Sequence, residues 1–249
     1  MSGALYEFPL SEKVRNYLRL EQLFAQLQEA KPATTEHQYL HFLDVFFNIM
    51  DLVERLDLRT DFLRDIDNHE RKLVHWSQHP DIDTEALKAA LQNMHRLSSL
   101  LKKNKKLGAS LREDRFLVSI RQRFSIPGGA TCFDLPALFC WLKQRDEIKQ
   151  ADMQNWLSQL TLIDNSLAML LSFLREKARF TTIKSKNGYY QGTAEEKLEL
   201  VRVQCDSSVA LYPVVSGSRN RFGVKFMQLN VDTVSGAVTG PVEFQLSCC

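Results

Sequence analysis

The chain has 249 residues, of which 44% are hydrophobic and 25% are charged, and its formal net charge is only +2. These values are typical of a folded globular protein, so they exclude wholesale disorder, a fibrous repeat and a polar low-complexity chain. The length exceeds the usual size of one compact core, and we expect two domains of unequal size. The longest uninterrupted apolar run, Ala137 to Leu142, is far shorter than a bilayer-spanning helix, which needs about 20 residues. Because the start of the sequence also lacks a secretory signal, we expect a cytoplasmic protein with no membrane partner.

Apolar residues recur at helical spacing from Ser11 to about Arg179. The first predicted helix begins after a Ser11 cap and ends before Pro32. The second, over 35–56, carries a wide apolar face that suits the centre of a helical bundle. The first two thirds of the chain are therefore expected to be mostly antiparallel helix.

Later helix boundaries are predicted from capping residues. A third helix is expected to begin at Thr60 or Asp61, and Asp83 is expected to cap a fourth. The spacing from Thr161 to Asp164 is that of a capping box, which predicts a helix start there. The remaining predicted helices cover 110–122, 134–145, 151–160 and 162–179.

Short runs rich in β-branched and aromatic residues replace the helical pattern after Phe180, with turn signals between them. They predict an antiparallel sheet of about 70 residues, which would be marginal alone. We therefore expect it to lean on the helices and to recruit residues 4–9 and 124–133 as further strands. The predicted class is α+β, with a mainly antiparallel α-helical domain over 1–180 and a smaller antiparallel β domain over 181–249.

Charge is distributed unevenly along the helical region. Residues 36–85 hold 12 acidic and 5 basic side chains, whereas residues 86–149 hold 13 basic and 5 acidic ones. The two segments could face each other within one fold, or they could meet at an oligomer interface.

Cysteines and histidines give no strong chemical motif. Five cysteines without a Cys-x-x-Cys pair are most simply reduced thiols. The pairs His37 with His41 and His75 with His79 have the spacing of zinc ligands on a helix, but neither lies in a His-Glu-x-x-His motif. The sequence also lacks phosphate-binding and dinucleotide-binding glycine loops and a nucleophile elbow. We expect no metal, no cofactor and no catalytic residue.

A basic set in the predicted sheet is the strongest candidate for a binding site. Arg219, Arg221 and Lys225 share parity on one expected strand, so their side chains should project from one face while Phe222 and Phe226 bury the other. This face is either simply solvated or an acceptor for an extended or short helical peptide that carries carboxylates. Lys102 to Lys106, by contrast, suit the negative end of a helix dipole.

Beyond these patterns, a set of short motifs extends along essentially the whole chain. In the helical part they are Leu5 to Leu10, Glu12-Lys13, Leu18-Arg19, Glu21, Leu111 to Arg115, Arg121 to Arg123, Ser125 to Gly129 and Phe133 to Pro136. In the β part they are Asn187 to Gln191, Leu211 to Pro213, Ser216-Gly217, Arg221-Phe222, Phe226-Met227 and Cys248-Cys249. In these motifs and their spacing the sequence resembles the ZapD family of Z-ring-associated cell-division proteins.

The resemblance implies a non-enzymatic homodimer that acts at the mid-cell division site. It implies binding of the C-terminal tail of FtsZ, the tubulin-like division GTPase, and cross-linking of FtsZ protofilaments into bundles. By matched position, Arg221 and Lys225 with Arg55 look like the residues that hold the tail, and Arg219 shares their predicted face. Arg19 and Arg115 match positions associated with the dimer contact.

The residues also allow two other functions. One is a helical enzyme that pairs Cys132 or Cys140 with His75. The other is a nucleic-acid-binding module that uses Lys102 to Lys106 and Arg121 to Arg123. Because neither explains the full-length resemblance, no nucleic-acid partner is expected.

Overall fold

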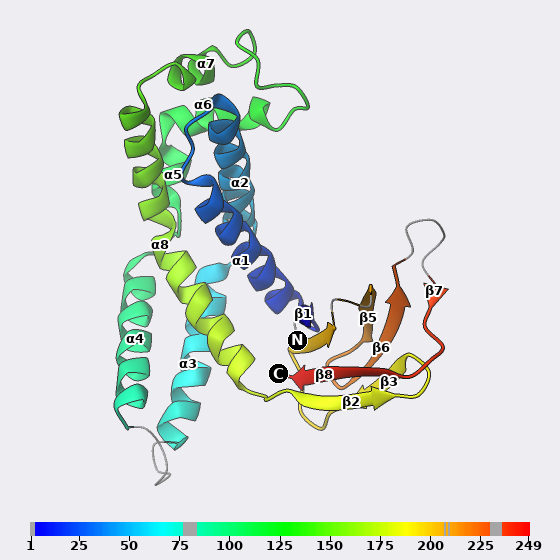
Figure 1. Ribbon diagram of the computed structural model, residues 1–249. Coiled ribbons are helices and arrows are strands. Elements are labelled where there is room, and N and C mark those ends of the chain that lie inside the picture. Colours follow the sequence, from blue (N-terminus) through cyan, green and yellow to red (C-terminus); the bar gives the residue numbers. More distant parts are fainter. Residues whose placement is uncertain (1–2, 77–83, 207, 209, 230–235) are drawn as a thin grey trace. The chain divides into compact units, whose positions relative to one another are not determined.

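The chain forms two compact units (Figure 1). The computed structural model describes residues 3–76, 84–206, 208, 210–229 and 236–249. One unit, the helical unit, is Arg19–Leu170, and the other, the sandwich unit, combines Met1–Leu18 with Leu171–Cys249. Helices in the first part of the chain are followed by antiparallel sheets, so the predicted α+β class is confirmed.

Helices α1 and α2 begin where the sequence predicted. The hydroxyl of Ser11 accepts a hydrogen bond from the Val14 amide at 3.3 Å, and α1 covers Glu12–Ala30. Helix α2, Glu36–Arg55, opens with a capping box between Thr35 and Gln38. Its wide apolar face is buried, as expected of a central helix, and the buried side chains are Tyr39, Phe42, Leu43, Val45, Phe46, Phe47, Ile49, Met50 and Val53.

Two later boundaries differ from the prediction. Helix α3, Leu58–Trp76, begins before Thr60, because the carboxylate of Asp57 already accepts from the Thr60 amide at 3.3 Å. The helix expected over 110–122 is divided by Asp114, which caps the second part by accepting from the Leu117 amide at 3.0 Å. The two parts are α5, Ala109–Glu113, and α6, Arg115–Phe124. Helix α4 covers Thr84–Lys103, and its predicted Asp83 cap lies outside the described residues.

The helix break predicted at Thr161 is wrong. Helix α8 runs without interruption over Asp146–Glu176, and the Thr161 hydroxyl donates back to the Leu157 carbonyl at 3.3 Å instead of capping a new helix. The buried face of α8 in the helical unit holds Met153, Trp156, Leu160, Ile163, Leu167 and Leu170. By length and composition alone α8 could span a bilayer, but core helices of soluble proteins meet the same criterion.

Residues 124–133 do not form the expected extra strand. Helix α6 ends at Phe124, and turns follow in which the Ile126 amide donates to the Arg123 carbonyl and the Gly129 amide to the Ile126 carbonyl. The Pro127-Gly128-Gly129 sequence explains this, since proline and glycine favour turns over a central strand. Helix α7 then covers Pro136–Leu142.

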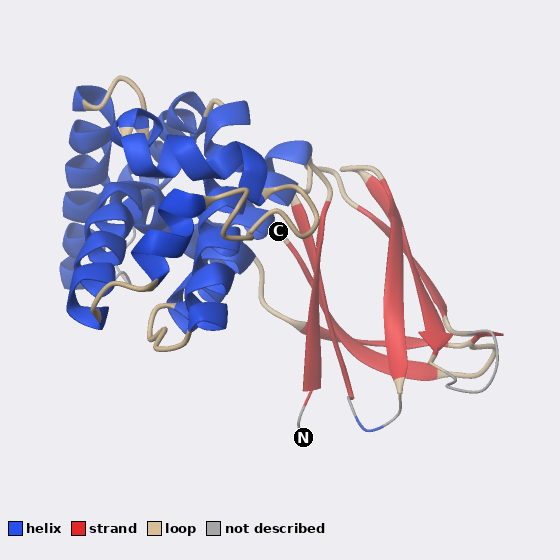
Figure 2. Cartoon of the chain, turned by 90° about the horizontal axis from the view of Figure 1, so that it is seen from above, coloured by secondary structure: helices blue, strands red, loops and turns tan. Residues whose placement is uncertain are grey.

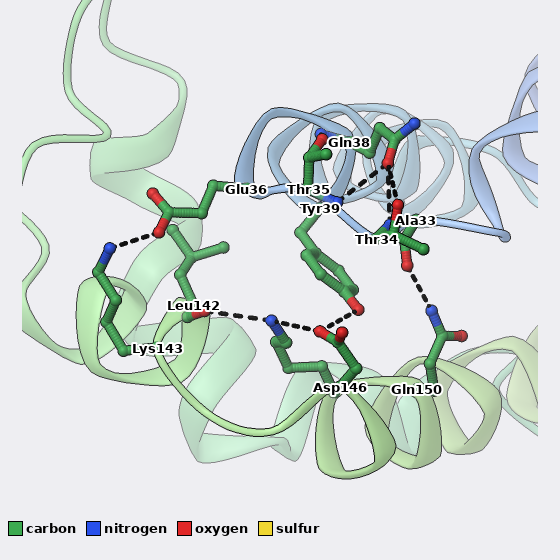
Figure 3. Close-up of polar contacts among 11 residues, drawn as sticks. Ala33, Thr34, Thr35, Glu36, Gln38, Tyr39, Leu142, Lys143, Asp146 and Gln150 are labelled. Atoms are coloured by element: carbon green, nitrogen blue, oxygen red, sulfur yellow. Dashed lines mark hydrogen bonds and ion pairs between the residues drawn. The ribbon is translucent and has the colours of Figure 1, made fainter.

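Contacts between α2 and the later helices pair opposite charges within the helical unit. The Arg121 guanidinium binds Glu54 and Asp51, and Lys143 binds Glu36. These contacts join the acidic and basic segments of the sequence, and they agree with the explanation that the segments face each other within one fold. Figure 3 shows the contacts at the start of α2, where the Tyr39 hydroxyl also lies 3.1 Å from an Asp146 carboxylate oxygen.

Two antiparallel sheets form the sandwich, whose strands Figure 2 shows in red. The first has the order β1-β4-β8-β2, and the second has the order β3-β6-β5 with β7 paired to β6. The strands are β1 (Gly3–Pro9), β2 (Thr181–Ser185), β3 (Tyr189–Thr193), β4 (Leu200–Asp206), β5 (Leu211–Gly217), β6 (Arg221–Gln228), β7 (Gly236–Ala237) and β8 (Val242–Cys248). Residues 4–9 thus lie in a strand, which pairs with β4.

The sandwich core is built from alternate residues of both sheets. Phe222, Val224 and Phe226 of β6 are buried with Val203 of β4 and Phe244 of β8. The rings of Phe226 and Phe244 have centroids 4.9 Å apart, a separation that favours tilted aromatic pairs. Because side chains alternate along a strand, burial of this set fixes which β6 residues point outward.

Candidate partner-binding face

The outward side of the β3-β6-β5 sheet carries positive charge and no negative charge on its strands. On β6 the outward residues are Arg221, Gly223, Lys225 and Met227, since the residues between them are buried. No Asp or Glu occurs in β3, β5, β6 or β7. We call this side the cationic face, and we define it by the outward residues Tyr189, Gln191, Thr193, Tyr212, Val214, Ser216, Arg221, Gly223, Lys225 and Met227.

Arg221 is exposed at the start of β6 and is oriented by a neighbour on β3. With the side-chain amide of Gln191 turned so that its oxygen faces the guanidinium, Arg221 Nη2 and Nε both donate to that oxygen at 2.7 Å. These two bonds leave the Nη1 donors of Arg221 for another acceptor. Gln191 therefore holds the guanidinium on the cationic face without neutralising it.

Lys225 is exposed in the middle of the same strand, between two exposed apolar side chains. Its register partners are Tyr189 on β3 and Val214 on β5, whose exposed fractions are 46% and 45%. Arg221 and Lys225 are four residues apart on one side of the strand, which corresponds to about 13 Å. The face thus presents two separated cations with apolar surface beside the second one.

Arg219 was predicted to share this face, but it does not lie on it. Strand β6 begins at Arg221, and Arg219 lies in the turn before it. Its Nη2 is 3.1 Å from Glu199 Oε1, and its Nε donates to the Leu198 carbonyl at 3.2 Å. The alternation of β6 does not extend to Arg219 because the turn interrupts it, and the guanidinium of Arg219 is bound to Glu199 instead.

The other three predicted arginines lie in the helical unit. Arg55 is in the last turn of α2, with its side chain 76% exposed and 3.9 Å from Asp51. Arg19 is on the exposed side of α1, and Arg115 is the exposed first residue of α6. They occupy surface positions, as residues that contact a partner would.

Sequence patterns did not reveal the ion pairs that hold β1 and the end of α8 to the sheet. Glu7 on β1 accepts from Arg175 Nη2 at 2.6 Å and from Arg202 Nε at 2.9 Å. Burial raises the pKa of Glu7, but the hydrogen bonds and charges of both arginines outweigh it, and the pKa lies below its ordinary value. Burial likewise raises the pKa of Glu199, and the nearby Lys13 and Lys177 lower it more strongly. Both carboxylates therefore serve as partly buried anionic anchors in the sandwich unit.

The described residues offer no metal site. Among them, no group of three or more His, Cys, Asp and Glu side chains could hold a metal ion. His37 and His41 are exposed on α2, whereas the pair His75 and His79 lies outside the residues whose side chains are described. All five cysteines are free, and Cys132 and Cys140 are exposed. The side chain of His75, which the enzyme hypothesis pairs with Cys132 or Cys140, lies outside the described residues.

The basic residues considered for nucleic-acid binding are partly engaged within the helical unit. Arg121 is bound to Glu54 and Asp51, and Arg123 donates to the Asp134 carbonyl at 3.3 Å. Lys102 and Lys103 lie in the last turn of α4, where the negative end of the helix dipole stabilises positive charges. These contacts give the basic residues structural roles.

Comparison with known proteins identifies the class. Residues 18–225 match the family profile described as ZapD, cell division protein. The cell division protein ZapD of Cronobacter sakazakii is 37% identical over 245 residues, covering 98% of both chains. That of Idiomarina loihiensis is also 37% identical over 245 residues, covering 98% of this chain and 96% of the relative. The protein of an Enterobacter species is 35% identical over 248 residues, covering 100% and 99%.

These matches define a non-enzymatic cell-division protein with an α+β fold. The chain belongs to the ZapD family. The family resemblance seen in the sequence is thereby confirmed, and the hypothesis of a helical enzyme is rejected.

Proposed function

We propose that this protein binds the C-terminal tail of FtsZ through the cationic face and, as a homodimer, cross-links FtsZ protofilaments at the division site. The observation that carries this proposal is that Arg221 and Lys225 are exposed on one side of a sheet whose strands contain no acidic residue. Such a face attracts a segment that carries carboxylates. Membership of a cell-division family supports the choice of partner.

Two copies of a weak site are sufficient for bundling. Contacts between exposed charges contribute only about 0–1 kcal/mol each, so one tail on one face should dissociate readily. In a two-fold dimer, binding of one filament holds the second face near other tails at an effective concentration that reaches the millimolar range. Avidity then increases by about 100-fold or more without any new contact.

The other four predicted site residues contribute to tail binding or to the dimer in this proposal. Arg55, on the helical unit, provides a further exposed cation for the tail. Arg219 contributes least, because its guanidinium is already bound to Glu199. Arg19 and Arg115 support the dimer, so Arg19→Glu and Arg115→Glu should shift the protein toward monomer in analytical ultracentrifugation and should weaken bundling.

The proposal is tested by co-sedimentation with FtsZ filaments, with and without their C-terminal tail. The wild-type protein should pellet only with tailed filaments, and Arg221→Glu should lower the pelleted fraction by about tenfold or more while the dimer stays intact. Lys72→Glu is the matched control, because it reverses one exposed charge on α3, outside the cationic face. Wild-type pelleting by Arg221→Glu would remove this face as the site, and pelleting with tailless filaments would remove the tail as the ligand.

A further inference from the structure

Between Arg221 and Lys225, the cationic face carries an aromatic platform that consists of one tyrosine ring lying over one glycine. Gly223 is the outward residue midway between the two cations, and it has no side chain to fill the space above the strand. A Cβ atom built on Gly223 would stand 2.7 Å from the Tyr189 hydroxyl oxygen and 3.1 Å from a ring carbon. The ring of Tyr189 therefore extends from its own register position opposite Lys225 to cover Gly223.

The platform remains accessible although it lies against the sheet. Tyr189 is 46% exposed, whereas Gly223 beneath it is buried. The exposed Val214 lies across β6 from Tyr189, so apolar surface continues on the β5 side of Lys225. Along β6 the face thus presents a cation, an aromatic ring and a second cation, at positions i, i+2 and i+4.

We propose that the cationic face selects an extended peptide with two carboxylates four residues apart and an apolar side chain midway between them, which packs on the ring of Tyr189. This inference rests on the proposed function and specifies the ligand of the same face. In an extended chain the side chains at i, i+2 and i+4 share one side and span about 13 Å, which matches the spacing of Arg221, the platform and Lys225. The two cations attract the carboxylates of the peptide, and the central apolar side chain fixes the position of the peptide along β6.

Gly223 is a specificity-determining position in this arrangement. A Cβ atom there would meet the hydroxyl end of the Tyr189 ring, so the ring must shift from its present position while both cations keep their charge. Gly223→Ala therefore displaces the platform without changing the charge of the face. Tyr189→Thr removes the ring and keeps a β-branched residue that suits an edge strand, and Tyr189→Phe keeps the ring and removes only the hydroxyl.

The test uses three synthetic peptides of equal length and charge, measured by fluorescence anisotropy against the full-length protein. Each carries Asp at positions 1 and 5 of its central segment. The first has Leu at position 3, the second has Ser at position 3, and the third has Leu at position 2 and Ser at position 3. The wild-type protein and Tyr189→Phe should bind the first peptide about five- to tenfold more tightly than the other two, because only its leucine faces the ring. Tyr189→Thr and Gly223→Ala should bind all three peptides equally and weakly.

The outcomes separate this inference from the proposed function. Equal binding of the three peptides by the wild-type protein, with loss of binding in Arg221→Glu, would overturn the platform and leave the electrostatic site standing. A leucine preference that survives in both Tyr189→Thr and Gly223→Ala would also overturn it. If Arg221→Glu pelleted with FtsZ filaments like wild type, the proposed site itself would fail. Circular dichroism of each variant identifies one that has lost its fold, and the two platform variants change different strands.

Discussion

The guanidinium of Arg121 on α6 forms a two-pronged pair with the carboxylate of Glu54 on α2, with Nη1 2.6 Å from Oε1 and Nη2 3.0 Å from Oε2. The pair joins the acidic segment of the sequence to the basic one. The hydrogen bond to Glu54 raises the pKa of Arg121, against the opposing effect of burial. The same guanidinium also binds Asp51, so one cation holds two acids of α2 against α6.

Loss of this cation should destabilise the helical unit. Arg121→Ala leaves Glu54 and Asp51 without their shared partner, and we expect the free energy of unfolding to fall by about 2 kcal/mol. Arg121→Lys should recover only part of this, because an ammonium group cannot form the two-pronged contact. Urea unfolding followed by circular dichroism measures both changes. Unchanged midpoints for both variants would show that the pair contributes nothing measurable.

Glu7 should make the stability of the sandwich unit depend on pH. Because its pKa is lowered on folding, Glu7 contributes stability that is fully present above its ordinary value of 4.5 and is lost as the pH falls through the folded-state pKa. Glu7→Gln should therefore unfold about 2 kcal/mol more easily than wild type at neutral pH, and the difference should shrink in acid. Denaturant midpoints measured across this pH range test the sign, and a difference that grows toward low pH would contradict it.

Tail binding should weaken steeply with salt. The screening length falls from about 10 Å at 0.1 M ionic strength to about 3 Å at 1 M, and the proposed contact is between exposed charges. Bundling of FtsZ by the wild-type protein, followed by light scattering, should decrease as salt rises through about 0.15 M. The dimer itself, followed in the same buffers by ultracentrifugation, is the control for loss of bivalency. Bundling that is insensitive to salt would exclude an electrostatic site.

The cysteines should differ in their reactivity. Burial, and to a smaller extent the adjacent Cys249, raise the pKa of Cys248 to about 11, so little thiolate is present at about pH 8. Cys132 and Cys140 are exposed and should be alkylated first by iodoacetamide, as mass spectrometry of timed samples would show. In denaturant all five should react at similar rates. If Cys248 were modified as fast as Cys140 in the native protein, the thiol of Cys248 would not be protected by burial as expected.

Capping residues predicted a helix start correctly where no longer-range packing opposed it. The Ser11 cap involves residues three apart, and it forms as expected. The Thr161 capping box failed although its spacing was correct, because a run of buried side chains from Met153 to Leu170 favours one continuous helix. Burial of that face outweighs the small contribution of a single cap.

The same distinction applies to the candidate site. Alternation along β6 correctly places Arg221 and Lys225 outward, since burial of Phe222 and Phe226 fixes the parity. Parity could not show that Arg219 precedes the strand and is bound to Glu199. Nor could it show that Gln191 orients Arg221, because that contact depends on the pairing of β3 with β6. The domain boundary near residue 180 stays a prediction.

The sequence by itself thus determined the class of fold, the change from helices to strands and the family, because these depend on periodicity and on residue identity along the chain. Tertiary structure alone decided which charges remain available. Of the three basic residues between 219 and 225, one is bound to an acid 20 positions away, one is held by an amide on the neighbouring strand, and one lies beside an aromatic ring. The physical reason is that the strength of a charge–charge contact depends on distance and burial, which strand pairing sets between residues far apart in the sequence.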